Sequence, residues 1–269
     1  SNARVQADSI IRGGDDRLLV VVGPCSIHDP QAALEYGERL KEQAQRLRED
    51  LFILMRVYFE KPRTAVGWKG LINDPHIDDS FAINEGLQLA RRLLLDFGNM
   101  ELGVGTEFLD TITPQFIADL ISWGAIGART SESQTHRQLA SGLSMPIGFK
   151  NGTGGSIQLA VDGIISSNSK HGFLGVDRSG KAAIVTTRGN QDAHLILRGG
   201  SDKPNYDSQS VLDAVNKLKD SGANTSIVID ASHANSFKDH TKQPAVFRNI
   251  IDQRISGNKN IIGIMLESN

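Results

Sequence analysis

The sequence lacks several features that mark whole classes of protein. It has one cysteine among its 269 residues, which excludes an internal disulfide and leads us to expect the reducing cytoplasm. Its longest apolar runs, such as residues 18–22, are far shorter than the roughly 20 residues that cross a bilayer, and we identify no secretory signal. Its 29 basic and 31 acidic residues nearly balance, so we expect neither a nucleic-acid surface nor polybasic attachment to a membrane.

What the sequence does contain is a repeated alternation of apolar strands and amphipathic helices. Residues 18–22 form a continuous apolar run, as a strand buried on both faces requires. Asp29 then predicts an N-cap with Pro30 at the first helical position. We expect strands at residues 18–22, 52–59, 102–108, 125–128, 146–150, 195–197, 226–229 and 261–266. Helices are expected from Pro30, around 83–94, after a Thr113–Pro114 cap, and at 134–141, 157–165, 208–220 and 244–255.

Eight such units in about 250 residues predict a (β/α)8 TIM barrel. A doubly wound open sheet is the alternative, and the number of strands favours the barrel. Residues 173–176 and 183–187 flank Gly180 and predict a β-hairpin inserted between the fifth and sixth units. No linker divides the chain, so we expect one domain over residues 4–269. Residues 1–3 resemble the remainder of an expression tag, and residues 4–16 are predicted to be a partly ordered lead-in.

Ionisable or metal-binding side chains follow every predicted strand. Barrel enzymes place their chemistry at the C-terminal ends of the strands, so these residues should meet at one mouth. They are Cys25, Arg56 with Lys61 and Arg63, Glu107, Arg129, Lys150, Arg198, Asp230 with His233, and Glu267. Each alone could be a solvated loop residue. Together, the six cations would repel one another without bound anions, which predicts two phosphorylated ligands, one of them also a carboxylate.

Cys25, His233 and Glu267 offer a soft, a borderline and a hard donor. This set suits a divalent transition metal, Mn²⁺, Fe²⁺, Co²⁺ or Zn²⁺. A lone cysteine is more often a small buried apolar residue, and a lone histidine is more often a loop residue, so the metal prediction depends on the three sharing one mouth. Glu107 is expected to orient a water or stabilise a developing cation. Residues 151–155 lack the Lys-Ser/Thr of a Walker loop and predict a tight strand-to-helix turn.

Six motifs in this order resemble class I 3-deoxy-D-arabino-heptulosonate 7-phosphate (DAHP) synthase. They are GPCSIHDP at 23–30, KPRT with GWKGL at 61–71, GAIGART at 124–130, GFKNGT at 148–153, ILRGG at 196–200 and SHAN at 232–235. The match runs nearly from end to end of the chain. The sister family, 3-deoxy-octulosonate 8-phosphate synthase, shares the barrel and the chemistry but lacks the KPRT and GWKGL arrangement.

The resemblance implies metal-dependent condensation of phosphoenolpyruvate with erythrose 4-phosphate, the entry step of the shikimate pathway to the aromatic amino acids. It also implies a role for each motif residue. Arg129, Arg198 and the Ala128 backbone are expected to bind the phosphate of phosphoenolpyruvate, and Arg56, Lys61 and Lys150 its carboxylate. The phosphate of erythrose 4-phosphate is expected to bind Arg63 and Thr64. The implied metal ligands are Cys25, His233 and Glu267, and the implied catalytic residues are Lys61, Glu107 and His233.

The sequence departs from the family pattern at its ends. The family has a fourth metal ligand, an aspartate after the eighth strand, and then a closing helix. Both would lie beyond Asn269, where this sequence stops, so we expect three protein ligands for the metal within it. The usual N-terminal extension is also short.

The inserted hairpin resembles the family's regulatory element for an aromatic amino acid. Pro114, Gln115, Ser144, Phe173 and Gly175 are the expected inhibitor contacts. Gly175 would leave room for a ring hydroxyl, which favours tyrosine over phenylalanine as the inhibitor. The family also leads us to expect a homodimer or homotetramer.

Two other functions stay open from the sequence. One is a related enzyme, a class II-type metal aldolase or the octulosonate synthase. The other is a catalytically inactive barrel kept as a binding or regulatory partner.

Overall fold

The structure is a computed structural model that describes residues 2–177 and 179–268. Eight parallel strands close into a barrel in the order β1-β10-β9-β8-β5-β4-β3-β2. They are β1 (Leu18–Gly23), β2 (Leu51–Arg56), β3 (Val104–Glu107), β4 (Trp123–Ile126), β5 (Ile147–Lys150), β8 (His194–Leu197), β9 (Ile227–Asp230) and β10 (Ile261–Glu267). The predicted TIM barrel is confirmed, and the open sheet is excluded because β1 pairs with both β2 and β10.

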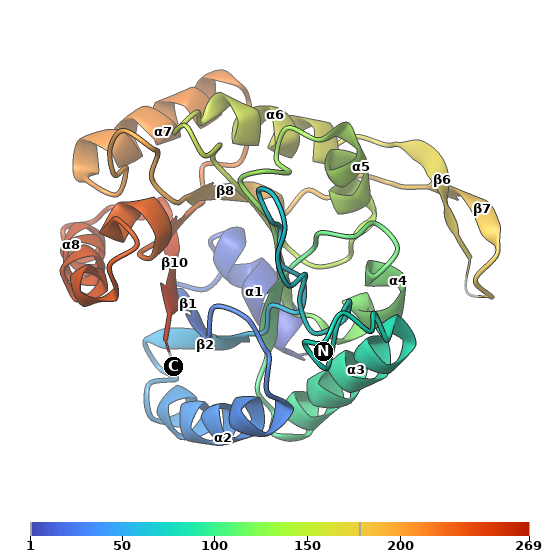
Figure 1. The fold of residues 1–269 in the computed structure, drawn as a ribbon. Coiled ribbons are helices and arrows are strands. Elements are labelled where there is room, and N and C mark those ends of the chain that lie inside the picture. Colours follow the sequence, from blue (N-terminus) through green and yellow to red (C-terminus); the bar gives the residue numbers. More distant parts are fainter. Residues whose placement is uncertain (1, 178, 269) are drawn as a thin grey trace.

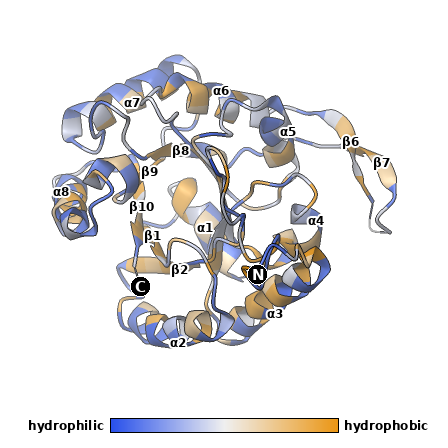
Figure 2. Cartoon of the chain, in the orientation of Figure 1, coloured by the Kyte–Doolittle hydropathy of each residue, from blue (hydrophilic) through white to orange (hydrophobic). Residues whose placement is uncertain are grey.

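Helices surround the barrel and turn their apolar faces toward it (Figures 1 and 2). They are α2 (Pro30–Arg46), α3 (Ile83–Asn99), α4 (Pro114–Ile117), α5 (Gln134–Gly142), α6 (Gln158–Ser167), α7 (Ser208–Asp220) and α8 (Gln243–Ile255), with 3₁₀ turns η1 (Ala118–Leu120), η2 (His233–Ser236) and η3 (His240–Lys242). Asp29 caps α2 as predicted, accepting from the backbone N–H groups of Gln31 and Ala32. Thr113 is the N-cap residue of α4 with Pro114 at its start, as predicted, but its hydroxyl caps no backbone N–H group and donates to Glu60. Within the described residues, no helix is long and apolar enough to span a bilayer.

The prediction of a partly ordered lead-in before β1 is wrong. Residues 2–11 form helix α1 (Asn2–Ile11), which buries Ala7, Ile10 and Ile11. These three side chains pack with Leu19 and Phe52 in the apolar cluster inside the barrel. Because those two residues lie near the starts of their strands, α1 closes the N-terminal end of the barrel. The helix therefore forms through burial of one short apolar face, despite the polar composition of the segment.

The predicted hairpin lies between the fifth and sixth barrel strands. It consists of β6 (Gly172–Val176) and β7 (Ala182–Thr186), paired antiparallel, and it extends outward beyond the ring of helices (Figure 1). Leu174 pairs with Ile184 on one face, and these side chains are 83% and 78% exposed.

Strand alternation decides which side chains enter the barrel. Leu54, Trp123, Ile196, Val228 and Met265 form its interior with the α1 residues, and positions two residues apart along a strand face the same way. Six strands consequently direct an ionisable side chain into the C-terminal mouth. These residues are Arg56, Glu107, Lys150, Arg198, Asp230 and Glu267.

Glycine occupies the equivalent inward position on the other two strands: Gly23 at the end of β1 and Gly127 directly after β4. A Cβ at Gly127 would lie 2.5 Å from Glu107 Oε1, and one at Gly23 would lie 2.8 Å from the Arg56 carbonyl oxygen. Both distances are too short for a real side chain. Glycine at these two positions therefore leaves the room that the neighbouring functional residues occupy.

Candidate active site

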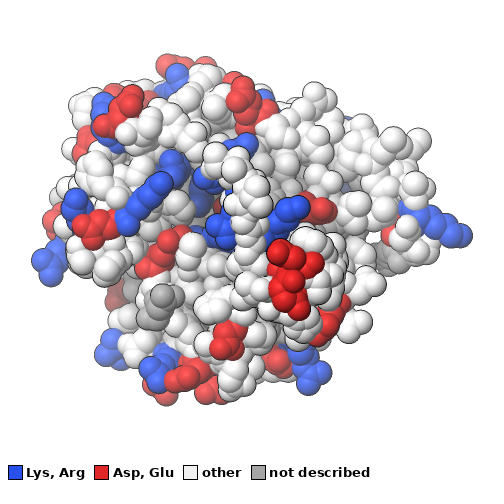
Figure 3. All heavy atoms as spheres, viewed as in Figure 1, with Lys and Arg blue, Asp and Glu red and all other residues white. Residues whose placement is uncertain are grey.

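The predicted cations converge on the barrel mouth. Arg56, Lys150 and Arg198 are buried there, and Lys61 is half-buried at the start of the loop that follows β2. Figure 3 shows Lys and Arg atoms gathered around a hollow at the centre of this face. Buried cations are costly unless anions accompany them, so the mouth is suited to an anionic ligand.

Arg56 is held by the loop after β1 and by β10. Its Nε donates to the Pro24 carbonyl at 3.1 Å, and its Nη2 donates to Glu267 Oε1 at 2.9 Å. Burial alone would lower the pKa of Arg56, but the negative charges of Tyr58, once ionised at high pH, and of Glu267 outweigh it and raise that pKa. Its Nη1 is buried and donates to no atom in the described part of the chain. Arg56 therefore carries one donor that the described protein atoms leave unsatisfied.

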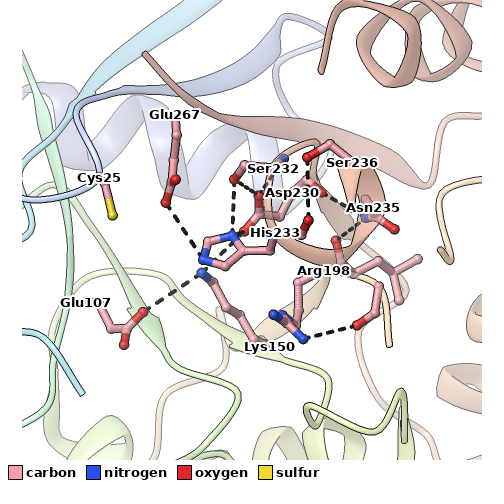
Figure 4. A network of polar contacts seen from close by, with 12 residues as sticks. Cys25, Glu107, Lys150, Arg198, Asp230, Ser232, His233, Asn235, Ser236 and Glu267 are labelled. Atoms are coloured by element: carbon pink, nitrogen blue, oxygen red, sulfur yellow. Dashed lines mark hydrogen bonds and ion pairs between the residues drawn. The ribbon is translucent and has the colours of Figure 1, made fainter. Parts of the chain in front are cut away.

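Lys150 lies between two carboxylates at the centre of the site (Figure 4). Its Nζ is 3.3 Å from Asp230 Oδ2 and 3.8 Å from Glu107 Oε2. Burial opposes the charge of Lys150, but the negative charges of Tyr58, once ionised at high pH, and of Asp230 and Glu107 raise its pKa. For Asp230, burial is outweighed by its interactions with His233 and Lys150, which hold its pKa well below the ordinary value. The buried pair is therefore ionised.

Arg198 and Arg129 form the second cationic pair. Burial lowers the pKa of Arg198, and the nearby charge of Arg129 lowers it further. Arg129 itself is exposed in the turn after β4, next to the half-buried Ala128. This repulsion would be relieved by an anion between the two guanidinium groups.

His233 is oriented by the residue that ends β9. Its Nδ1 lies 2.9 Å from Asp230 Oδ2, and its Nε2 lies 3.7 Å from Glu267 Oε1. The backbone of His233 is left-handed, with φ +54°, a conformation that costs on the order of 1 kcal/mol for such a residue and is found at functional sites. The sequence placed Asp230 at the mouth but did not predict its contact with His233. Their separation of three residues after a strand was the available signal.

The predicted metal ligands line one cavity of about 960 Å³. Cys25 is exposed, and its Sγ lies 3.2 Å from Lys61 Nζ. Within residues 2–177 and 179–268, no three His, Cys, Asp or Glu side chains are already grouped closely enough to hold an ion. The donors nevertheless fit a transition metal in chemistry, because Asp230 engages His233 Nδ1 and leaves Nε2 directed at the cavity.

The loop between β2 and α3 crosses the mouth (Figure 1). The backbone N–H of Lys61 donates to the Lys69 carbonyl, and Arg63 Nε donates to the Trp68 carbonyl at 2.7 Å. Gly70 closes the loop at φ +112°, and a Cβ there would collide with the Phe59 carbonyl oxygen. Arg63 and the neighbouring Thr64 are exposed, so they lie on the outer side of the site.

Three buried asparagines that sequence reasoning did not single out join the loops after β5, β8 and β9. Asn151 Oδ1 accepts from the Arg198 backbone N–H at 2.8 Å and from Asn205 Nδ2 at 3.1 Å. Asn235 accepts from the Asn205 backbone N–H and donates to the Asp230 carbonyl oxygen. Asn151 and Asn235 stand inside the GFKNGT and SHAN motifs, which was the only available signal. The network fixes the backbone on which Arg198 and Asp230 stand.

The five predicted inhibitor contacts occupy two places. Pro114 is buried at the start of α4, whereas Gln115 and Ser144 are exposed, and Ser144 Oγ accepts from Arg4 Nη1 at 2.8 Å. Phe173 and Gly175 are half-buried on β6. In the described part of the chain, no hydrogen bond joins these two hairpin residues to the other three. An added Cβ at Gly175 would meet Val185 Cγ2 at 2.8 Å, which is a local reason for glycine at this position.

Comparison with known proteins agrees with this geometry. The model of the DAHP synthetase I family matches residues 2–269. The chain is 56% identical over 268 residues to the Phe-sensitive phospho-2-dehydro-3-deoxyheptonate aldolase of Escherichia coli, covering 100% of the chain and 76% of that protein. It is 52% identical over 269 residues to the Tyr-sensitive enzyme of the same species, covering 100% and 75%.

A solved structure is equally similar. The phospho-2-dehydro-3-deoxyheptonate aldolase of Francisella tularensis superimposes with a TM-score of 0.97 at 56% identity, covering 100% of this chain and 78% of that one. Family, identity and fold therefore agree along the whole chain, which belongs to the DAHP synthetase I family.

Proposed function

We propose that the protein condenses phosphoenolpyruvate with erythrose 4-phosphate to give DAHP and phosphate. The observation that carries this proposal is the buried cationic mouth, in which Arg56 Nη1 donates to no atom of the described residues. Two further features support it: the pair of Arg129 and Arg198, and a loop that holds Arg63 at the outer side of the site. These features suit a small ligand with a carboxylate and a phosphate, together with a second phosphorylated ligand.

We assign the cationic side chains of the mouth to the two anionic groups of phosphoenolpyruvate, its carboxylate and its phosphate. Arg56, Lys61 and Lys150 would take its carboxylate, because the Arg56 guanidinium and the two ammonium groups all lie within 5.8 Å of the Tyr58 ring centroid. Arg198 and Arg129, with the Ala128 backbone, would take its phosphate and so relieve the repulsion that lowers the pKa of Arg198. Arg63 and Thr64 would hold the phosphate of erythrose 4-phosphate.

The reaction joins C3 of phosphoenolpyruvate to the aldehyde carbon of erythrose 4-phosphate. Water then adds to C2, and inorganic phosphate leaves. Glu107 would orient this water, because its carboxylate is fixed beside Lys150 and faces the mouth. Holding both substrates by their anionic groups supplies rate by positioning the reacting carbons.

A divalent transition metal, Mn²⁺, Fe²⁺, Co²⁺ or Zn²⁺, would be held by Cys25, His233 and Glu267. When bound, it supplies Lewis-acid polarisation of the aldehyde oxygen. Asp230 orients His233 for this role. Lys61 meanwhile contacts the Cys25 carbonyl oxygen at 3.1 Å and thereby connects the metal-binding loop with the carboxylate-binding cations.

The test is a coupled measurement of phosphate release with two aldose phosphates. We expect turnover with erythrose 4-phosphate and little with arabinose 5-phosphate; the reverse preference would indicate the octulosonate synthase. Arg198→Met should raise KM for phosphoenolpyruvate, and Arg63→Met should raise KM for erythrose 4-phosphate. Arg39→Met, at an exposed cation on α2, is the matched control. A folded, metal-loaded protein that binds aromatic amino acids but turns over neither sugar would support the inactive barrel.

We also propose feedback regulation by an aromatic amino acid. The support is that relatives of this chain are named Phe-sensitive and Tyr-sensitive, together with the projecting hairpin that carries Phe173 and Gly175. Tyrosine is the proposed inhibitor, with Pro114, Gln115 and Ser144 as further contacts. Inhibition curves for tyrosine, phenylalanine and tryptophan decide this, and stronger inhibition by phenylalanine would contradict it. The expected homodimer or homotetramer can be measured by sedimentation on the same sample.

A further inference from the structure

Tyr58 lies under the three cations assigned to the phosphoenolpyruvate carboxylate. The centroid of its ring is 3.6 Å from Arg56 Cζ and 5.8 Å from both Lys61 Nζ and Lys150 Nζ. These distances are within the range of cation–π attraction. Tyr58 continues the inward alternation of Phe52, Leu54 and Arg56, and it packs in the interior cluster of the barrel. It is the group that all three cations share.

The hydroxyl of Tyr58 does not explain the position of this residue. The side chain is buried, and its hydroxyl has no hydrogen-bond partner in the described part of the chain. Burial raises the pKa of Tyr58 to about 12, although Lys150 and Arg56 oppose this. The phenol is therefore neutral, and the cations face the electron-rich ring rather than a phenolate.

The cations need such a partner because like charges gathered in a mouth repel one another. Arg56 has Glu267, and Lys150 has Asp230 and Glu107. Lys61 has the carbonyl oxygen and Sγ of Cys25 but no carboxylate among the described residues. A carboxylate beneath all three would neutralise them and compete with the ligand. A neutral ring attracts them and leaves their charge available to an anion.

We propose that Tyr58 is a positioning residue whose ring face gathers Arg56, Lys61 and Lys150 into the array that receives the substrate carboxylate. This assignment rests on the proposed function for the identity of the ligand. The gathering of the cations is a property of the unliganded protein and can be tested separately.

The first experiment compares two substitutions in the metal-loaded enzyme. Tyr58→Phe keeps the ring and removes only the unpartnered hydroxyl, so KM for phosphoenolpyruvate should change less than about twofold. Tyr58→Leu removes the ring and should raise that KM about tenfold, equivalent to about 1.4 kcal/mol, with KM for erythrose 4-phosphate nearly unchanged. Leu54→Ala, two residues earlier on the same inward face, is the control for core damage. It should lower Tm and leave both KM values unchanged.

The second experiment isolates the electrostatics of the ring, and it decides the matter even if Tyr58→Leu fails to fold. Phenylalanine bearing zero to three ring fluorines is incorporated at position 58, which weakens the ring's negative face with little change in shape. Both the Tm of the ligand-free protein and the affinity for phosphoenolpyruvate should fall with each fluorine. Flat responses in both would overturn the inference. If Tm falls with each fluorine but the wild-type protein shows no turnover, the ring–cation interaction would be supported and the proposed function rejected.

Discussion

Glu60 is a buried carboxylate whose protonation should make stability depend on pH. It directly precedes Lys61, and it accepts from Thr113 Oγ1 at 3.2 Å and from the backbone N–H groups of Asp110 and Leu109 at 3.3 and 3.5 Å. Burial, with a smaller contribution from the charge of Asp110, raises the pKa of Glu60 from the ordinary value of 4.5 to about 7. The three donors oppose this rise but do not cancel it.

The sign of the effect follows from proton binding. Between pH 4.5 and about 7 the folded protein binds a proton at Glu60 that the unfolded chain has released. Stability from this group is therefore complete below pH 4.5 and is lost as pH rises through about 7. A pKa difference of about 2.5 corresponds to at most about 3.4 kcal/mol, since each pKa unit is 1.36 kcal/mol.

Glu60→Gln cannot ionise and keeps one acceptor, so it should escape this loss. We expect the free energy of unfolding of Glu60→Gln, measured with urea relative to wild type, to increase by about 2–3 kcal/mol between pH 4.5 and pH 8. Asp110→Asn should shift the wild-type transition to lower pH, because it removes one charge that raises the pKa of Glu60.

A difference between Glu60→Gln and wild type that stays constant across this range would show that the pKa of Glu60 is not raised by folding. A difference that instead favours wild type as pH rises would mean that Glu60 is stabilised as the carboxylate, and that its three donors outweigh its burial.

Three other perturbations test the site. Asp230→Asn should destabilise the protein by about 3–5 kcal/mol, because it leaves Lys150 buried with only Glu107 nearby, and should lower kcat by about tenfold or more through His233; unchanged urea midpoint and kcat would contradict both. Gly127→Ala should lower kcat while the protein stays folded, because its Cβ would displace the Glu107 carboxylate. The matched control is Gly98→Ala on α3, where a Cβ meets no atom within 4 Å. Removal of metal by a chelator should abolish phosphate release, and added Mn²⁺, Fe²⁺, Co²⁺ or Zn²⁺ should restore it. Cys25→Ser should raise the metal concentration needed for this restoration. Full activity in metal-free buffer would exclude the metal proposal.

Much of the fold could be predicted from the sequence because its signals are local. A strand buried on both faces is apolar along its length, and a helix that packs on a barrel shows apolar residues three and four apart. Asp29 and Pro30 fix the start of α2 by contacts within one turn. The cations at the strand ends were also visible, because parallel strands in a barrel all end at the same mouth.

Other features depended on contacts between distant segments. The apolar face of α1 has only three fully buried residues, and it is stable because the open end of the barrel receives it. Thr113 stands at the N-cap position of α4, but its hydroxyl donates to Glu60, which is 53 residues away in the sequence, and not to the helix backbone. The asparagine network joins three loops whose proximity exists only after the barrel closes.

The amino-acid sequence alone was enough to predict the order of the barrel strands and of the helices that follow them, the family, and the kinds of side chain at the barrel mouth, but not helix α1. Which side chains meet at the mouth, as Asp230 meets His233 and Tyr58 meets Lys150, is visible only in the folded protein. The physical reason is that secondary structure follows from interactions between near neighbours in the chain. Pairing across the mouth depends on the register in which eight strands close, and no short stretch of sequence encodes that register.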